Sequence, residues 1–184
     1  MPTANAVRPW LRRSAPALYR FINHPCPSIA NMNALELKVP PPLVALAVAL
    51  AMWMVSTVTP AIAVDFLIRA IVAVGVALLG GAIGAAGNIA FRLAKTTVNP
   101  MKPEKASSLV TVGIYRFTRN PMYVGLLLVL VGWQVFLAAP WALVGPLAFA
   151  AYITRFQITP EERVLASLFG AAYGHYKARV RRWL

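Results

Sequence analysis

The hydrophobic positions of the chain fall into long apolar stretches that are separated by shorter polar segments. Four such stretches run over about 43–58, 70–91, 122–139 and 141–158. A helix needs about 20 consecutive apolar residues to cross the ~30 Å hydrocarbon core of a bilayer. The pattern therefore predicts an all-α, polytopic membrane protein with about four transmembrane helices.

The third and fourth apolar stretches are almost contiguous. Only the short segment Ala139-Pro140-Trp141 separates them, which leaves almost no room for a loop. This spacing predicts a tight helical hairpin over about 122–158. The more polar sequence that follows predicts a C-terminal helical segment on the cytoplasmic side of the membrane.

The composition excludes an ordinary soluble domain. Of the 184 residues, 59% are hydrophobic and 12% are charged, whereas soluble domains carry about 25% charged residues. The one cysteine, Cys26, cannot form an intrachain disulfide or a Cys-based metal site, and His24 and His175 are far apart in the sequence. We therefore expect no metal site.

The charges predict the orientation of the helices. The chain has 18 Lys and Arg residues against 5 Asp and Glu, which gives a net charge of +13. In the four-helix topology every positive residue except Arg69 falls on one side, and cytoplasmic loops collect Lys and Arg. We therefore expect both chain termini to be cytoplasmic. Attraction to anionic lipids is a second effect of the basic excess, and nucleic-acid binding is not expected.

The N-terminal part of the chain differs from the rest. Residues 1–31 hold five prolines and no long apolar run. We predict that residues 1–38 form a basic N-terminal extension and that 39–184 form a single membrane domain. Met32 would serve equally well as a natural start, so the sequence leaves the status of residues 1–31 open.

Two local patterns concern helix ends and helix contacts. Asp65 and Arg69 are four residues apart, so they can pair on one face of a helix. Gly80 and Gly84 have the small-xxx-small spacing that permits close contact between helices in a membrane.

Polar and aromatic motifs lie in two segments that flank the hairpin. The hairpin brings both segments to one membrane face, so carboxylates, aromatic rings and helix N-termini meet at the boundary between water and lipid. Such a combination suits a small cationic molecule such as S-adenosylmethionine. The motifs are Leu109-Val110-Thr111-Val112-Gly113-Ile114-Tyr115, Arg119-Asn120-Pro121-Met122-Tyr123-Val124-Gly125, Glu161-Glu162 and Phe169-Gly170-Ala171-Ala172-Tyr173-Gly174-His175-Tyr176.

Each motif alone also has a purely structural explanation. Asn120-Pro121 is a typical helix start, in which the asparagine caps the helix. Thr159 and Glu162 have the spacing of a capping box, and Gly170 can end a helix in a left-handed turn. The combination is not explained in this way, because the only acidic pair lies across a short hairpin from an Arg-Asn-Pro-x-Tyr turn.

In the order and spacing of these motifs the sequence resembles the membrane methyltransferases typified by isoprenylcysteine carboxyl methyltransferase, with the phospholipid N-methyltransferases as relatives. The resemblance covers about residues 90–184. It implies an S-adenosylmethionine cofactor and a lipophilic small-molecule or lipid-linked acceptor at the cytoplasmic face. It also implies that the cofactor is bound by Leu109, Val110, Tyr115, Arg119, Asn120, Pro121, Tyr123, Glu161 and Glu162.

The sequence departs from the family pattern at two positions. The resemblance implies that an arginine just before the Glu-Glu pair acts on the acceptor, and the catalytic candidates here are Arg155 and Asn120. Gln157 stands where an arginine is expected, and Asn120 replaces the usual histidine. Asparagine can form hydrogen bonds but cannot titrate near neutral pH.

Methyl transfer depends mainly on the alignment of donor and acceptor. A carboxylate acceptor needs no general base, whereas an ammonium group must first lose a proton. Because the sequence shows no clearly positioned base, it favours a carboxylate or a thiol acceptor, with a phospholipid or amine N-methyltransferase as the alternative. A small membrane transporter or assembly subunit is a third hypothesis. That class places polar residues at the membrane midplane, where Gln134 is the main polar residue here.

Overall fold

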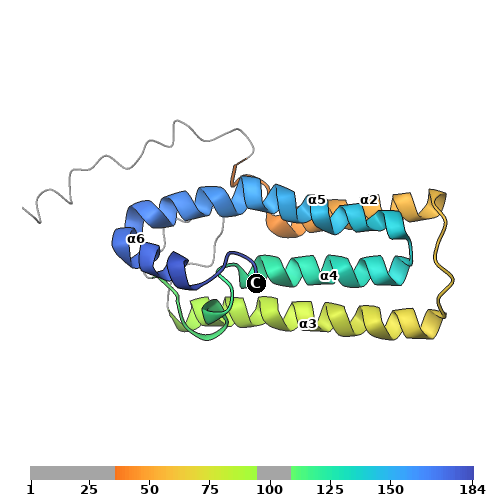
Figure 1. Cartoon of the computed structure of the whole chain (residues 1–184), viewed down its shortest axis with the longest axis horizontal. Coiled ribbons are helices and arrows are strands. Elements are labelled where there is room, and N and C mark those ends of the chain that lie inside the picture. Colours follow the sequence, from red (N-terminus) through yellow and green to blue (C-terminus); the bar gives the residue numbers. More distant parts are fainter. Residues whose placement is uncertain (1–35, 95–108) are drawn as a thin grey trace, which may run out of the picture. The chain divides into compact units, whose positions relative to one another are not determined.

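The computed structural model describes residues 36–94 and 109–184, which belong to one compact unit. Most of the predicted N-terminal extension, residues 1–35, lies outside the described residues. Within the described ranges every regular element is a helix, as predicted, and one isolated β-bridge joins Thr118 to Arg181. The elements (Figure 1) are α2 (Pro41–Val58), α3 (Phe66–Leu93), η4 (Gly113–Arg116), α4 (Pro121–Leu137), η5 (Pro140–Leu143), α5 (Val144–Ile153), η6 (Thr154–Ile158) and α6 (Thr159–Arg179).

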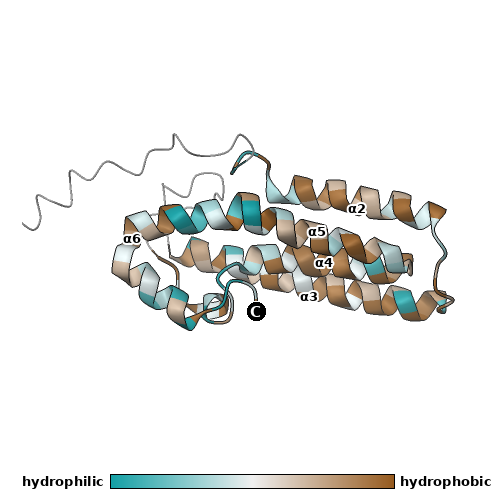
Figure 2. Cartoon of the chain, turned by 45° about the horizontal axis from the view of Figure 1, so that its top comes forward, coloured by the Kyte–Doolittle hydropathy of each residue, from teal (hydrophilic) through white to brown (hydrophobic). Residues whose placement is uncertain are grey.

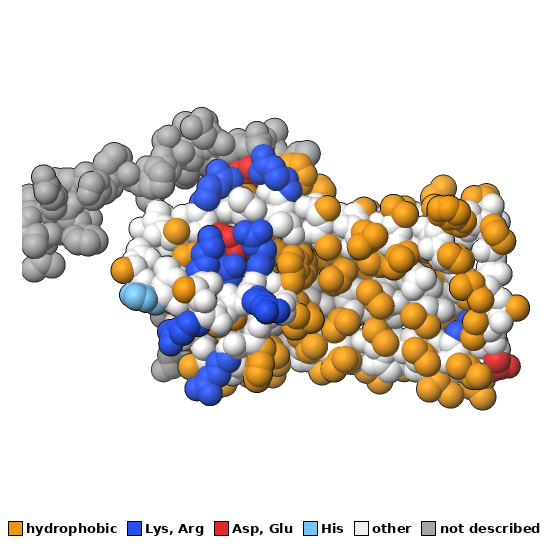
Figure 3. Space-filling view, viewed as in Figure 1, with side chains coloured by type: hydrophobic (Ala, Val, Ile, Leu, Met, Phe, Trp, Pro, Cys, Tyr) orange, Lys and Arg blue, Asp and Glu red, His pale blue; other side chains and the backbone are white. Residues whose placement is uncertain are grey.

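Two of the described helices, α2 and α3, are long and apolar enough to cross a membrane. Helix α2 covers the predicted stretch 43–58, and α3 extends the predicted stretch 70–91 at both ends. Helix α4 is equally apolar but has 17 residues. The helices are hydrophobic along most of their length (Figure 2), and orange side chains cover this part of the molecule (Figure 3). An apolar surface of this extent marks contact with a membrane.

The N-terminus of α3 corrects one prediction. Asp65 does not pair with Arg69 but caps the helix, because its carboxylate accepts hydrogen bonds from the N–H groups of Leu67 (2.9 Å) and Ile68 (3.2 Å). The cap satisfies backbone donors that have no partner inside the helix. The guanidinium of Arg69 lies instead over the ring of Phe136, 5.9 Å from its centre.

Helices α3 and α4 approach each other closely at glycines. A Cβ atom on Gly80 would lie 2.6 Å from the Gly125 carbonyl oxygen, and one on Gly125 would lie 2.6 Å from the Gly80 carbonyl oxygen and 3.0 Å from the Gly84 nitrogen. The predicted helix contact at Gly80 and Gly84 is therefore confirmed. Because the backbones touch, the position of α4 on α3 is fixed.

Helices α4 and α5 form the predicted hairpin. Ala138 ends α4 in the left-handed conformation with a φ of 50°. The short element η5 follows directly, so α5 runs back beside α4 (Figure 1).

The helix does not start afresh at Thr159, so the predicted capping box is wrong. Instead α5 continues through the π-helical turn η6 into α6, and the Thr159 hydroxyl donates to the Thr154 carbonyl (2.7 Å). Pro160 has no N–H and its ring would crowd the carbonyl four residues earlier in an α-helix. That carbonyl, of Phe156, accepts a hydrogen bond from the N–H of Leu37 (3.1 Å). The wider π turn thus accommodates the proline.

A bend within α6 directs the end of the chain back towards α4. Gly170 has a φ of 48° and a ψ of −122°, a combination that glycine adopts but that lies outside the left-handed helical region. The predicted left-handed end of the helix is therefore wrong, and the helix resumes beyond this residue. The second half of α6 therefore faces the start of α4 (Figure 1).

Candidate active site

Tyr123 and Glu161 join the first turn of α4 to the first turn of α6. Tyr123 is buried, and its hydroxyl donates a 2.6 Å hydrogen bond to Oε1 of Glu161. The Glu161 residue as a whole is partly exposed, but its carboxyl group is buried. Within the described residues no Lys or Arg side chain forms an ion pair with it. Its negative charge, when present, is therefore not balanced by a neighbouring cation.

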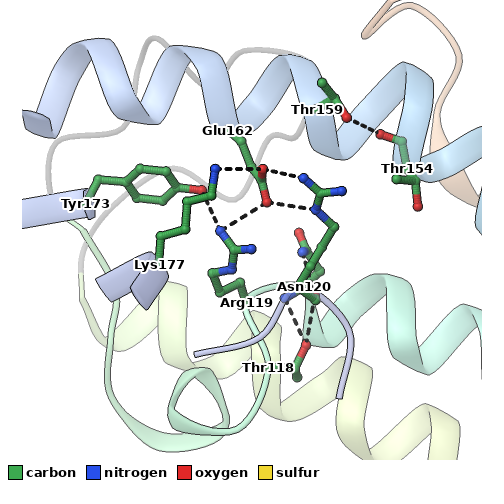
Figure 4. Close-up of polar contacts among 9 residues, drawn as sticks. Thr118, Arg119, Asn120, Thr154, Thr159, Glu162, Tyr173 and Lys177 are labelled. Carbon is green, nitrogen blue, oxygen red and sulfur yellow. Dashed lines mark hydrogen bonds and ion pairs between the residues drawn. The ribbon is translucent and has the colours of Figure 1, made fainter. Parts of the chain in front are cut away.

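The adjacent Glu162 lies among three basic side chains (Figure 4). The guanidinium of Arg182 forms a bidentate contact with Glu162, in which Nε donates to Oε1 (3.0 Å) and Nη2 donates to Oε2 (2.7 Å). Nη1 of Arg119 lies 3.1 Å from Oε1, and Nζ of Lys177 lies 3.8 Å from Oε2. These four residues, the Glu162 cluster, tie α6 to the turn before α4 and to the segment after α6.

The two neighbouring carboxyl groups have opposite acid–base properties. Burial raises the pKa of Glu161 from its ordinary value of 4.5 to about 8, against the opposing effect of the Tyr123 hydrogen bond. Burial is also the largest effect on Glu162. The Arg182 hydrogen bonds and the positive charges of the cluster nevertheless lower its pKa below the ordinary value. At neutral pH, Glu162 is ionised and Glu161 is mostly protonated.

The segment after α6 lies along the turn before α4. The Arg119 N–H donates to the Arg181 carbonyl (3.0 Å). The side chains of Asn120 (2.8 Å) and Thr118 (3.3 Å) both donate to the Arg182 carbonyl. The sequence predicts that the Asn120 side chain caps α4. This prediction is wrong, because the side-chain amide of Asn120 is turned towards Arg182.

The aromatic wall of the site comes from η4. Tyr115 is buried, and its ring meets that of Phe91 edge to face with 5.3 Å between the ring centres. Its carbonyl accepts a 2.8 Å hydrogen bond from the hydroxyl of Tyr176 on α6. Val110 belongs to the same small apolar cluster, and Leu109 beside it is partly buried.

Arg155 makes a different set of contacts. Its Nη1 lies 3.0 Å from the carboxylate of the buried Glu36, which also binds Arg163 at 2.6 Å. Gln157, two residues further on, is fully buried; its Nε2 donates to the Val39 carbonyl (2.7 Å), and its Oε1 has no partner. Both side chains therefore bind the segment that precedes α2 and not the Glu162 cluster.

The structure thus brings most of the predicted cofactor-binding residues to one place, the turn before α4 and the first turns of α4 and α6. Sequence reasoning missed Arg182 and Lys177, which complete the Glu162 cluster. The basic residues of the chain end are visible in the sequence, where the positive-inside rule alone already accounts for them. The predicted residues brought together are Tyr115, Arg119, Asn120, Pro121, Tyr123, Glu161 and Glu162.

The fold and the site define a helical membrane protein with a compact polar site beyond the ends of its apolar helices. Residues 68–172, more than half of the chain, match the family model described as phospholipid methyltransferase. The chain therefore belongs to the phospholipid methyltransferase family, and the resemblance seen in the sequence is confirmed.

Individual relatives match shorter stretches. An uncharacterized protein of Haemophilus influenzae is 46% identical over 63 residues, which cover 34% of this chain and all of that protein. Protein-S-isoprenylcysteine O-methyltransferase B of Arabidopsis thaliana is 39% identical over 83 residues, 44% of this chain and 41% of that protein. Methanethiol S-methyltransferase 1 of Bradyrhizobium diazoefficiens is 41% identical over 70 residues, 36% of this chain and 22% of that protein. The chain thus matches less than half the length of these two named enzymes.

Proposed function

We propose that the chain is an S-adenosylmethionine-dependent methyltransferase that acts on a lipophilic acceptor at the cytoplasmic face of a membrane. The observation that carries this proposal is the Tyr123–Glu161 hydrogen bond, which puts a carboxyl group without a cationic partner beside aromatic rings. A carboxylate and tyrosine faces suit a sulfonium ion. The family membership and the names of the relatives support the same reaction class.

The residues present fit the cofactor. Glu161 would balance the sulfonium charge, since no cation in the described part of the chain does so, and Tyr123 would hold its carboxyl group in place. Leu109, Val110 and Tyr115 offer apolar and aromatic surface for the adenosine. When bound, the cofactor supplies a methyl group that is already activated for displacement. The protein then has to align the acceptor with it and exclude water.

The proposed topology has four spans, with α5 and η6 as the fourth. Most of the charged side chains on the face drawn in Figure 3 gather at the end of the molecule that carries α6, and apolar side chains cover most of the rest of that face. Lys and Arg collect on the cytoplasmic side of membrane proteins. This distribution supports cytoplasmic termini and a cytoplasmic site.

The acceptor is proposed to carry a carboxylate or a thiol. Two named relatives are an isoprenylcysteine O-methyltransferase and a methanethiol S-methyltransferase, which supports these two chemistries. Arg155 and Asn120 are proposed to act on the acceptor side. The guanidinium of Arg155 is half-exposed and can therefore meet an acceptor carboxylate, while Asn120 can only donate or accept a hydrogen bond.

One observation also favours the alternative, a phospholipid or amine N-methyltransferase. An ammonium acceptor must lose a proton before transfer. Glu161, whose pKa of about 8 lies close to physiological pH, is a group that could take up that proton in its ionised form. The sequence alone did not indicate such a base.

Calorimetry on the purified protein in detergent and in lipid nanodiscs tests the proposal. We expect S-adenosylmethionine to bind, and Glu161→Ala and Tyr123→Phe to weaken binding. Phe66→Leu, at the far end of α3, serves as a control that should bind normally. If the folded wild-type protein binds no S-adenosylmethionine in either environment, the methyltransferase proposal is wrong. A non-enzymatic transporter or assembly subunit is then favoured.

A further inference from the structure

An apolar groove lies between α2, α3 and α4, away from the candidate active site. Its volume is about 670 Å³, which lies in the range of small-molecule sites. Helix α4 packs against both α2 and α3 and forms the floor of the groove. Small residues on all three helices leave the space open, namely Ala45, Ala49, Ala73, Ala77 and Gly132.

The groove is about as deep as one leaflet of a bilayer. Helix α2 ends and α3 begins at the same end of the molecule, where residues 59–65 connect them (Figure 1). From this end the groove follows α2 from Trp53 back to Ala45, a separation of eight residues that corresponds to about 12 Å. Half of the ~30 Å hydrocarbon core is about 15 Å. The groove therefore has the length that one acyl chain of a leaflet occupies.

Arg69 lies at the end of the groove that faces the α2–α3 connection. It precedes the groove residue Ala73 by one turn on the same face of α3. Its guanidinium lies 5.9 Å from the ring centre of Phe136, which also lines the groove. Where the structure describes the chain, no carboxylate forms an ion pair with Arg69, and Asp65 instead caps α3. The end of the groove therefore carries a positive charge that no ion pair neutralises.

The guanidinium is only partly enclosed. Nε of Arg69 is buried and has no hydrogen-bond partner in the described part of the chain, whereas the residue as a whole is partly exposed. The terminal Nη groups are therefore the donors that a ligand can reach. Ionisable residues at membrane depth are rare and usually have a partner.

We propose that the groove holds one acyl chain of a phospholipid from the leaflet farther from the candidate active site, and that Arg69 binds the phosphate of this lipid. The apolar groove and the guanidinium beside it match the two parts of such a molecule. A guanidinium presents its N–H donors in a plane that suits the oxygens of a phosphate. The bound chain fills the space between α2 and α3.

This lipid is not the methyl acceptor. Tyr123 lies in the first turn of α4 and Phe136 in its last turn, and 13 residues of helix correspond to about 20 Å. A phosphate at Arg69 is therefore far from the Tyr123–Glu161 hydrogen bond. The proposal depends on the apolar helices lying in a membrane, but not on the cofactor or on the reaction.

Native mass spectrometry of the detergent-solubilised protein tests the role of Arg69. The probe is dioleoylphosphatidylglycerol, and dioleoylglycerol is the matched lipid without a phosphate. We expect one phospholipid per chain, bound about 10- to 100-fold more tightly than dioleoylglycerol, as for hydrogen bonds to a charged group. Arg69→Gln should lose this preference and Arg69→Lys should keep part of it. Arg92→Gln, an exposed position at the other end of α3, is the control and should bind as the wild type does.

A second pair of variants tests the groove itself. Val74 lines the groove and is 56% exposed, so Val74→Trp fills the groove without disturbing a packed core. It should weaken the binding of both lipids by at least about 10-fold, because several methylene groups lose their apolar contacts. Val72→Trp introduces the same side chain on α3 at an exposed position that does not line the groove, and it should leave both affinities unchanged.

Three results would overturn the proposal. The first is equal affinity of the two lipids for the wild-type protein, or an unchanged preference in Arg69→Gln. The second is unchanged lipid binding in Val74→Trp, which would mean that the acyl chain lies elsewhere. The third is a dimer that Val74→Trp dissociates, because a second copy of the chain would then occupy the groove. Each of these results leaves the methyltransferase proposal intact, since binding of S-adenosylmethionine is measured separately.

Discussion

Glu161 and Glu162 are adjacent in the chain, yet one carboxyl group contacts a tyrosine hydroxyl and the other contacts three cations. Neighbouring residues on a helix point about 100° apart, so the first turn of α6 presents them to different surroundings. Pairs of titratable groups whose environments separate their pKa values commonly have different roles. We assign a ligand-binding role to Glu161 and a structural role to Glu162, which holds the site together.

The first prediction concerns the pH dependence of stability. The pKa of Glu161 is raised from 4.5 to about 8 in the folded protein, mainly by burial. Between these values the folded state binds one proton more than the unfolded state, so stability falls as the pH rises. We expect thermal unfolding of the ligand-free protein to show this fall between about pH 4.5 and 8. The Glu161→Gln variant, which keeps the shape of the side chain, should lose that part of the slope. Parallel curves for the two proteins would contradict the assignment.

The second prediction concerns ligand affinity. A sulfonium ion favours the ionised form of Glu161, which is the minor form below about pH 8. S-adenosylhomocysteine lacks the methyl group and the positive charge, so it is a matched neutral ligand. The ratio of the two affinities should rise with pH and level off only above about pH 8, where Glu161 is mostly ionised. In Glu161→Gln the ratio should not change with pH. If the ratio also stays constant in the wild-type protein, Glu161 does not bind the sulfonium.

A third prediction compares two neighbouring substitutions. Glu162→Gln leaves the nearly buried Arg119 without its counter-charge. Breaking a buried ion pair in this way lowers the free energy of unfolding by about 3 kcal/mol. Glu161→Gln removes no ion pair and should not lower the unfolding temperature at pH 8. Thermal unfolding in one detergent at one pH measures both variants. If the two variants unfold at the same temperature, the Glu162 cluster has no structural role.

A fourth prediction concerns the contact between α3 and α4. Gly125→Ala would place a Cβ atom 2.6 Å from the Gly80 carbonyl oxygen, so the helices must separate. Overpacking of this kind costs about 1–3 kcal/mol. Gly81→Ala is the control, because a Cβ atom there meets nothing within 4 Å. The first variant should unfold at a lower temperature and bind S-adenosylmethionine more weakly, since Tyr123 moves with α4, while the second should behave like the wild type.

Much of the fold could be predicted because an uninterrupted apolar stretch predicts where an apolar helix begins and ends, and two of these helices, α2 and α3, are long enough to cross a membrane. The four stretches coincide with α2, α3, α4 and the continuous α5–η6 segment. It was harder to predict which of two possible local interactions a residue forms. The cap at Asp65 formed in place of an ion pair with Arg69, and Pro160 produced a π turn instead of a new helix. Both outcomes depend on small differences between two allowed local arrangements.

The site was predictable where residue spacing carries the information and not where tertiary contacts do. Tyr123 and Glu161 belong to motifs that the sequence displays, and they meet. The pairing of Arg182 with Glu162 depends on the bend at Gly170, which turns the end of α6 back onto α4. A sequence shows that a glycine can bend a helix, but it does not show the direction in which the chain continues.

The last prediction tests whether the segment after α6 positions the site. Arg182 connects the segment after α6 with the turn before α4 and with the first turn of α6. Its carbonyl accepts hydrogen bonds from Asn120 and Thr118, and its side chain binds Glu162. Arg182→Ala keeps the backbone contacts but removes the two hydrogen bonds from the guanidinium to Glu162. These bonds hold the first turn of α6 in place. We expect a loss of about 1–3 kcal/mol in stability and weaker binding of S-adenosylmethionine, partly recovered in Arg182→Lys because a lysine keeps the charge.

Arg181→Ala is the matched control for this prediction, because Arg181 also contacts the turn before α4 through its backbone alone. A positioning role requires that Arg182→Ala lower the affinity for S-adenosylmethionine even at temperatures where the variant is fully folded. Asn120→Ala should weaken binding in the same way, because it removes the second attachment of Arg182. If Asn120→Ala abolishes methyl transfer while binding is unchanged, Asn120 acts on the acceptor, and its contact with Arg182 is secondary.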